Sequence, residues 1–213
     1  MDLLMEWSTT IKAILFDLDG TLVEAKEWHY NALNSALTKV SNTKISRYEH
    51  VSELDGFPTK KKLQWLLERD RIDRSDVDKI EKLKQVETLR MVQRFCVPDK
   101  AKIELCKCLS EHYRLACVSN AVMASIETML LKSNLLPFFE FIQSNENVRP
   151  KPHPDPYLKT MKHMRVAPSE CVAVEDNSKG VQSAEAAGIR CLHLQYPEIT
   201  LERVRRYLDE INA

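Results

Sequence analysis

Short runs of apolar, β-branched and aromatic residues alternate along this chain with longer segments of helical periodicity. Five runs have the length and composition of buried strands, at 11–16, 114–118, 138–142, 171–174 and 190–194. A helical pattern precedes each of the last four, at 100–111 after an Asp99 cap, 122–133, 156–164 with Asp155 as cap, and 178–187 ended by Gly188. A last helix carries apolar residues at Leu201, Val204, Leu208 and Ile211. This alternation predicts a parallel sheet flanked by helices.

About a hundred residues separate the first predicted strand from the second, which is too long for an ordinary connection. Within them, apolar residues repeat at intervals of three and four, first around Leu33 and Leu37 and again around Leu63 and Leu66. We therefore expect an α/β protein with a Rossmann-like, three-layer parallel sheet core and an inserted all-helical domain. The expected boundaries are 1–23 and 97–213 for the core and 24–96 for the insert.

The composition argues against nucleic acids and membranes as partners. The chain of 213 residues carries 31 Lys and Arg and 31 Asp and Glu, so no overall positive field attracts nucleic acid or an anionic membrane. No apolar run approaches the ~18 residues of a membrane span, and the opening Met1–Trp7 lacks a basic leader. The six cysteines form no regular framework, which favours reduced thiols. We expect a cytoplasmic protein, monomeric or dimeric, without nucleic-acid or membrane partners.

The second half of the insert is basic. Residues 58–95 contain eleven Lys and Arg against seven Asp and Glu. A solvated helix surface explains such a surplus more often than a binding site does. Lys60, Lys61 and Lys62 are accordingly expected at the surface.

Polar residues follow four of the predicted strands near the point where each strand ends. Asp17-Leu18-Asp19-Gly20-Thr21 follows the first, Ser119-Asn120 the second, and Glu175-Asp176-Asn177 the fourth, while Lys151 lies in the loop after the third. The carboxyl ends of parallel strands share one edge of the sheet, where open α/β folds bind ligands. Carboxylates gathered there repel one another unless some are protonated or a cation lies among them. Oxygen ligands with one Lys nearby suit Mg²⁺ better than zinc.

The spacing of these residues suggests a division of roles. Asp17 and Asp19 leave an extended chain on the same side, and Gly20 permits a sharp turn after them. One carboxylate can act as nucleophile, and the other, if its pKa is kept higher, as general acid and base. Lys151, Ser119 and the N–H groups of the helix after Asn120 can bind phosphoryl oxygens. Each motif alone also suits an ordinary turn or helix cap, but their shared edge favours a functional site.

These segments resemble, in order, the four motifs of the haloacid-dehalogenase superfamily, and the insert is similar to the helical cap of the branch that holds phosphoglycolate phosphatase and β-phosphoglucomutase. The resemblance implies that Asp17 forms an aspartyl-phosphate and that Asp19 protonates the leaving oxygen and later activates water. It also implies that the phosphoryl oxygens and a Mg²⁺ ion are held by the polar groups at the sheet edge. The phosphoryl ligands would be Ser119, Asn120 and Lys151; the metal ligands would be Asp17, the Asp19 backbone carbonyl, Asp176 and, directly or through water, Glu175.

The resemblance implies a Mg²⁺-dependent hydrolase that removes phosphate from a small phosphorylated metabolite. A sugar phosphomutase and a non-catalytic module that binds a phosphorylated ligand remain alternatives. Residues 54–58 resemble the cap loop that approaches the substrate in this branch. His29 lies on the apolar face of the first helix of the insert, where a packed core histidine is the commoner case.

Overall fold

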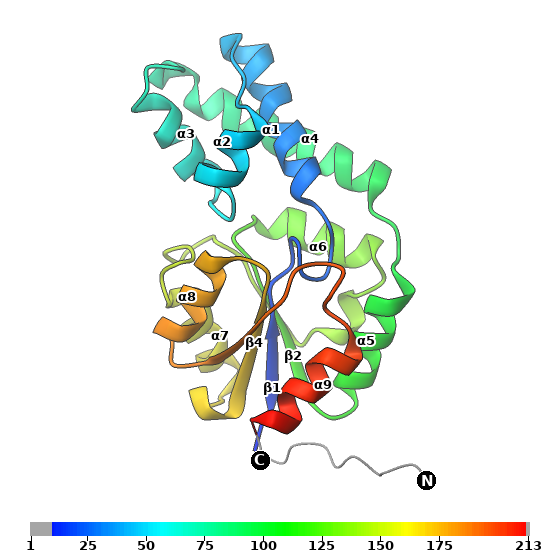
Figure 1. The fold of residues 1–213 in the computed structure, drawn as a ribbon. Coiled ribbons are helices and arrows are strands. Elements are labelled where there is room, and N and C mark those ends of the chain that lie inside the picture. Colours follow the sequence, from blue (N-terminus) through cyan, green and yellow to red (C-terminus); the bar gives the residue numbers. More distant parts are fainter. Residues whose placement is uncertain (1–9, 212–213) are drawn as a thin grey trace.

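The computed structural model describes residues 10–211, and in them a parallel sheet forms the centre of the molecule (Figure 1). Its strand order is β3-β2-β1-β4-β5, so the first strand is central and the chain crosses over on both sides of it. The predicted Rossmann-like core is confirmed. The strands are β1 (Ala13–Phe16), β2 (Arg114–Val118), β3 (Phe141–Gln143), β4 (Cys171–Glu175) and β5 (Arg190–His193).

Strand β3 begins later than predicted. The expected strand 138–142 starts only at Phe141, because Leu136–Phe138 form a 3₁₀ turn. Pro137 lies in that turn, where a missing N–H group costs nothing, whereas within a sheet it would remove a hydrogen bond of the ladder. The aromatic run of Phe138 and Phe139 therefore precedes the strand instead of forming it.

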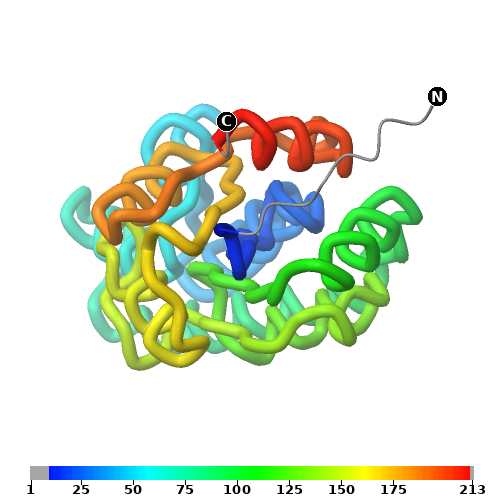
Figure 2. Tube along the Cα trace, turned by 90° about the horizontal axis from the view of Figure 1, so that it is seen from below, coloured from blue at the N-terminus to red at the C-terminus, as the bar shows by residue number. Residues whose placement is uncertain are grey.

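Helices cover both faces of the sheet and make the expected three layers. Ile14 and Phe16 of β1 are buried against one group of helices, and Ala13 and Leu15 against the other, because successive side chains of a strand point to opposite faces. Figure 2 shows the two groups on opposite sides of β1. One group is α5 (Lys100–Ser110), α6 (Met123–Lys132) and α9 (Leu201–Glu210); the other is α7 (Asp155–Met164) and α8 (Ser178–Ala186).

Two predicted helix caps have different outcomes. Asp99 caps α5 as expected, since its carboxylate accepts a hydrogen bond from the Ala101 N–H at 2.8 Å. Asp155 does not cap α7, because it is the first residue of that helix and its carboxylate pairs with the Arg149 guanidinium at 2.8 Å.

The insert is helical, as predicted, and lies over the carboxyl end of the sheet (Figure 1). Leu33, Leu37, Leu63 and Leu66 form its own apolar core. The exact boundaries at 24 and 96 stay a prediction. The helices are α1 (Lys26–Ser41), α2 (Arg47–Glu49), α3 (Thr59–Leu67) and α4 (Val77–Phe95), with a π turn at His50–Leu54 and a 3₁₀ turn at Arg74–Asp76.

The expectation of a cytoplasmic protein rests partly on Met1–Trp7, which lies outside the described residues. Within 10–211, no helix combines the length and the apolar composition that crossing a membrane requires.

Candidate active site

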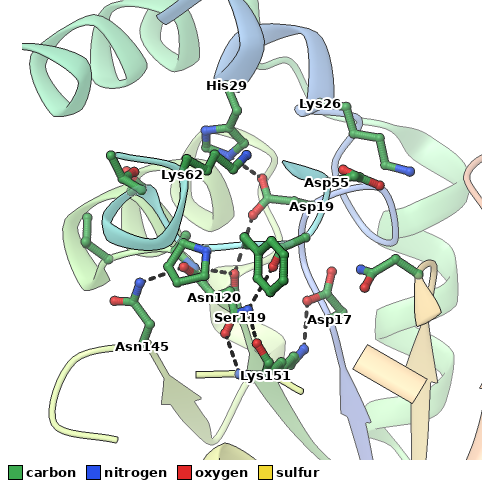
Figure 3. Close-up of a pocket in the computed structure, with 18 of the residues that line it drawn as sticks. Asp17, Asp19, Lys26, His29, Asp55, Lys62, Ser119, Asn120, Asn145 and Lys151 are labelled. Atoms are coloured by element: carbon green, nitrogen blue, oxygen red, sulfur yellow. Dashed lines mark hydrogen bonds and ion pairs between the residues drawn. The ribbon is translucent and has the colours of Figure 1, made fainter. Parts of the chain in front are cut away.

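The residues after β1 turn sharply at the carboxyl edge of the sheet. The Asp17 N–H donates to the Val174 carbonyl at 2.9 Å, so the ladder to β4 continues as far as the carboxylate. Gly20 has φ +87°, and a Cβ at this position would overlap the Asp176 carboxylate. The turn therefore requires glycine, and it brings both Asp17 and Asp19 into one pocket (Figure 3).

Lys151 is the buried cation at the floor of this pocket. Its Nζ donates to Asp17 Oδ1 at 2.8 Å, to Glu175 Oε1 at 2.5 Å and to the Val118 carbonyl at 2.6 Å. Burial lowers the pKa of Lys151, but the charges of Asp17 and Glu175 outweigh burial and raise it above its ordinary value. The Tyr157 hydroxyl also donates to Glu175 Oε1. Four segments that are distant in sequence thus meet at one fully charged lysine.

Three buried carboxylates form a cluster that fits a divalent cation. Asp17, Glu175 and Asp176 each present an oxygen, and these oxygens lie within 4.8 Å of one another. Glu175 Oε2 and Asp176 Oδ2 are buried without a hydrogen bond, although Lys26 Nζ forms an ion pair with Asp176 Oδ2 at 2.7 Å. Burial raises the pKa of Asp17 well above its usual value, and Glu175 and Asp176 add to this against the opposing charge of Lys151. An oxygen-lined site with surplus negative charge suits Mg²⁺.

Asp19 lies apart from this cluster and contacts the cap. His29 Nε2 donates to Asp19 Oδ1 at 2.8 Å, and Ser119 Oγ lies 3.4 Å from Asp19 Oδ2. Burial alone would raise the pKa of Asp19, but the interaction with His29, through its N–H hydrogen bond, and the nearby charge of Lys84 lower it below its usual value. The sequence analysis made the role of general acid conditional on a raised pKa, and in this structure the pKa of Asp19 is instead lowered. The cause is tertiary: two cap side chains surround Asp19.

His29 does not occupy the packed core position expected of it. It lines the pocket, and its Nδ1 lies 3.4 Å from Lys84 Nζ. Burial, followed by the repulsion of Lys84, lowers the pKa of His29 despite the neighbouring Asp19. A neutral ring that donates from Nε2 and accepts at Nδ1 satisfies both contacts.

Asn120 joins three loops instead of facing the pocket with a free amide. Its Nδ2 donates to the Gly56 carbonyl at 2.8 Å and to the Lys151 carbonyl at 3.1 Å, while its Oδ1 accepts from the Lys151 N–H at 2.9 Å. At the start of α6, the Met123 N–H donates to Glu146, so this N–H is not available to a phosphoryl group as the sequence suggested. All three predicted phosphoryl ligands, Ser119, Asn120 and Lys151, line the pocket, although the amide of Asn120 already makes these three hydrogen bonds.

The cap loop predicted at 54–58 does contact the core. Besides the bond from Asn120 to Gly56, Lys179 Nζ donates to the Asp55 carbonyl at 2.6 Å and lies 4.2 Å from the centre of the Phe57 ring. On the other side of the pocket, Gln85 of α4 donates to Ser125 of α6 at 2.6 Å. The cap is therefore closed over the carboxyl edge.

Two lysines of the cap were missed by sequence reasoning. Lys60 and Lys61 are exposed as expected, but Lys62 and Lys84 are each only 9% exposed and line the pocket. Helical spacing does indicate that both lie on a buried helix face, because Lys62 stands four residues before buried Leu66, and Lys84 four residues after buried Ile80. Burial is the main cause that lowers the pKa of each lysine to about 8.

The closed pocket is small. It encloses about 90 Å³ between the cap and the sheet edge, several times the ~15 Å³ that one water molecule requires. A larger groove of about 1080 Å³ adjoins it and shares Pro58, Gln85 and Asn145 with its lining. A small ligand can therefore be enclosed at the inner site and reach it from the groove.

Comparison with known proteins assigns the family. The model of the haloacid dehalogenase-like hydrolases matches residues 14–194. Protein CbbY of Rhodobacter capsulatus is 26% identical over 84% of this chain and 83% of its own length, and a phosphoglycolate phosphatase of Nitrosospira multiformis is 25% identical over 91% and 88%. A crystal structure of β-phosphoglucomutase from Clostridium difficile superposes with a TM-score of 0.79 at 20% identity, covering 94% of this chain and 98% of that one.

The chain belongs to the haloacid dehalogenase-like hydrolase family. The family predicted from the four motifs is thus confirmed, and with it the expected class of enzyme, a phosphatase of this family.

Proposed function

We propose that this protein is a Mg²⁺-dependent hydrolase that removes phosphate from a small phosphorylated metabolite through an aspartyl-phosphate. The observation that carries the proposal is the meeting of Asp17, Asp19, Lys151 and Asp176 in one closed pocket, with Glu175 buried beside them and bonded to Lys151. The phosphatase among its relatives supports the same reaction.

Asp17 is the proposed nucleophile. Its Oδ1 is held by Lys151, which leaves Oδ2 to attack phosphorus while the ester P–O bond breaks. Lys151 and Ser119 would bind the oxygens of the phosphoryl group, whose charge they partly balance. Asn120 would contribute indirectly, because its amide fixes the backbone on both sides of Lys151.

Asp19 is the proposed general acid and base. It would give its proton to the leaving oxygen and then take a proton from the water that attacks the aspartyl-phosphate. The dianionic phosphoryl group raises the pKa of Asp19 when it binds nearby, which opposes the effect of His29 and supplies the protonated form. The hydrogen bond from His29 keeps the carboxyl group oriented during both transfers.

Asp17, Glu175 and Asp176, with the Asp19 backbone carbonyl, would hold Mg²⁺, directly or through water. The bound ion would neutralise the carboxylate cluster and the charge that develops on the phosphoryl oxygens. Asp17, whose pKa is raised by burial, would be held in its ionised form beside a bound cation.

Release of orthophosphate from a panel of small phosphate esters, measured with and without Mg²⁺, tests the proposal. We expect turnover that requires Mg²⁺ and that is lost in both Asp17→Asn and Asp19→Asn. Undiminished turnover by Asp17→Asn would exclude the proposed nucleophile. Isomerisation of a sugar phosphate without release of orthophosphate would instead favour a phosphomutase.

A further inference from the structure

Lys62 is an unpaired cation buried in the cap. It belongs to α3, and only 9% of it is exposed. Its ammonium forms no hydrogen bond or ion pair within residues 10–211. Figure 3 shows its side chain extended into the pocket beside Asp19 and His29.

The other buried lysines of the described residues show how unusual this is. Lys151 has three acceptors, Lys102 donates to the Ile199 carbonyl and lies over the Tyr196 ring, and Lys84 contacts His29. Burying an ammonium ion without a partner is costly, so a retained example facing a cavity is a candidate for ligand binding. Among these buried lysines of the described residues, Lys62 is thus the one for which the protein supplies no partner.

The charges around Lys62 do not supply that partner. Asp55 and Asp19 attract it, but Asp19 is already bound by His29, and Lys84 and Lys179 repel it. His50, which also lines the pocket, has a pKa lowered to about 4 by burial and then by Lys62, so at neutral pH it adds no charge. The part of the pocket around Lys62 can therefore accept one more negative charge.

The position of Lys62 defines which part of a substrate would carry that charge. The proposed phosphoryl ligands Ser119 and Lys151 come from the core, whereas Lys62 comes from the cap, on the side of Asp19. Asp19 is the group proposed to protonate the leaving oxygen. The leaving group would therefore extend from Asp19 towards Lys62.

We propose that Lys62 determines specificity by binding a second anionic group, a carboxylate or a further phosphate, on the leaving group of the substrate. This inference rests on the proposed function. The substrate class is then a small phosphate ester that carries another negative charge a few atoms from the ester oxygen, which suits the small closed pocket.

Three synthetic esters with the same three-carbon leaving group test this. One ends in a carboxylate, one in a second phosphate, and the third, propyl phosphate, has no second charge. We compare kcat/KM for each charged ester with that for propyl phosphate in the wild type, in Lys62→Met, in Lys62→Gln and in the conservative Lys62→Arg. Lys61→Met is the matched control, since its side chain is exposed on the same helix.

We expect the wild type to prefer a charged ester to propyl phosphate. The ratio of the two kcat/KM values should fall at least about tenfold in Lys62→Met and Lys62→Gln, because each loses one hydrogen bond to a charged group. The loss should lie mainly in KM, Lys62→Arg should restore part of it, and Lys61→Met should leave the ratio unchanged. The ester with the larger loss identifies the anion.

A wild-type ratio near one for both charged esters, or ratios that stay within twofold in both Lys62 variants, would overturn the assignment of Lys62 while leaving the phosphatase intact. If the wild type cleaves none of the three esters, the proposed function is refuted, and this inference with it.

Discussion

Replacing Lys62 by Met should stabilise the protein, because it removes a buried charge and shortens the side chain by only one atom. Burial, with the repulsion of Lys84, lowers the pKa of Lys62 from its ordinary 10.5 to about 8. At about 1.4 kcal/mol per pH unit, that difference corresponds to a cost of about 3 kcal/mol in the free energy of unfolding. For a chain of this length the melting temperature should rise by roughly 6–12 °C.

The gain in the free energy of unfolding should decrease as the pH rises. Below pH 8 the lysine is charged in both the folded and unfolded states, so the full cost is present. Between about 8 and 10.5 the folded protein releases the proton first, the cost shrinks, and above 10.5 it disappears. The advantage of Lys62→Met should therefore fall from about 3 kcal/mol at pH 7 to below about 1 kcal/mol at pH 10.

Urea unfolding of both proteins at several pH values, in phosphate-free buffer, measures this difference. Exposed Lys61→Met should stay within about 0.5 kcal/mol of the wild type throughout. An absent gain at pH 7, or a gain of equal size at pH 10, would refute the burial argument.

Three further changes have defined outcomes. His29→Ala should lower kcat about tenfold or more with a smaller effect on KM, because Asp19 loses the hydrogen bond that orients it; steady-state kinetics with an unchanged kcat would contradict this. Gly180→Ala should destabilise the protein by about 1–3 kcal/mol, since a Cβ there would overlap the Glu175 carboxylate, and an unchanged thermal melt would show that the strand end adapts freely. Mg²⁺ at a hundredfold excess over its Kd should stabilise the wild type by about 2.7 kcal/mol, and an equal effect in Asp176→Asn would exclude that carboxylate as a ligand.

The core and its polar edge were predictable because they depend on local patterns. The buried strands are continuous apolar runs, since both faces of a parallel sheet are covered, and the residues that follow them share one edge whatever the details of packing. Asp17, Lys151 and Asp176 therefore met as expected. The start of β3 was wrong because an aromatic run is equally compatible with the 3₁₀ turn that Pro137 favours.

The cap side of the site could not be predicted in the same way. Whether His29 and Lys84 surround Asp19 depends on how the insert is placed over the sheet, and helical periodicity carries no information on that placement. Spacing does mark Lys62 and Lys84 as residues on buried helix faces. Only the tertiary structure shows that these faces border a pocket, where the pKa of Asp17 is raised and that of Asp19 is lowered.

The most direct test of the account is detection of a phosphoryl group on Asp17. The protein is mixed with Mg²⁺ and a radiolabelled phosphate ester that it hydrolyses, quenched in acid within a single turnover, and digested for mapping. We predict a hydroxylamine-labile label on the peptide that contains Asp17, absent from Asp17→Asn. Orthophosphate release by a wild-type protein that never carries this label, or a label mapped to another residue, would contradict the central role of Asp17.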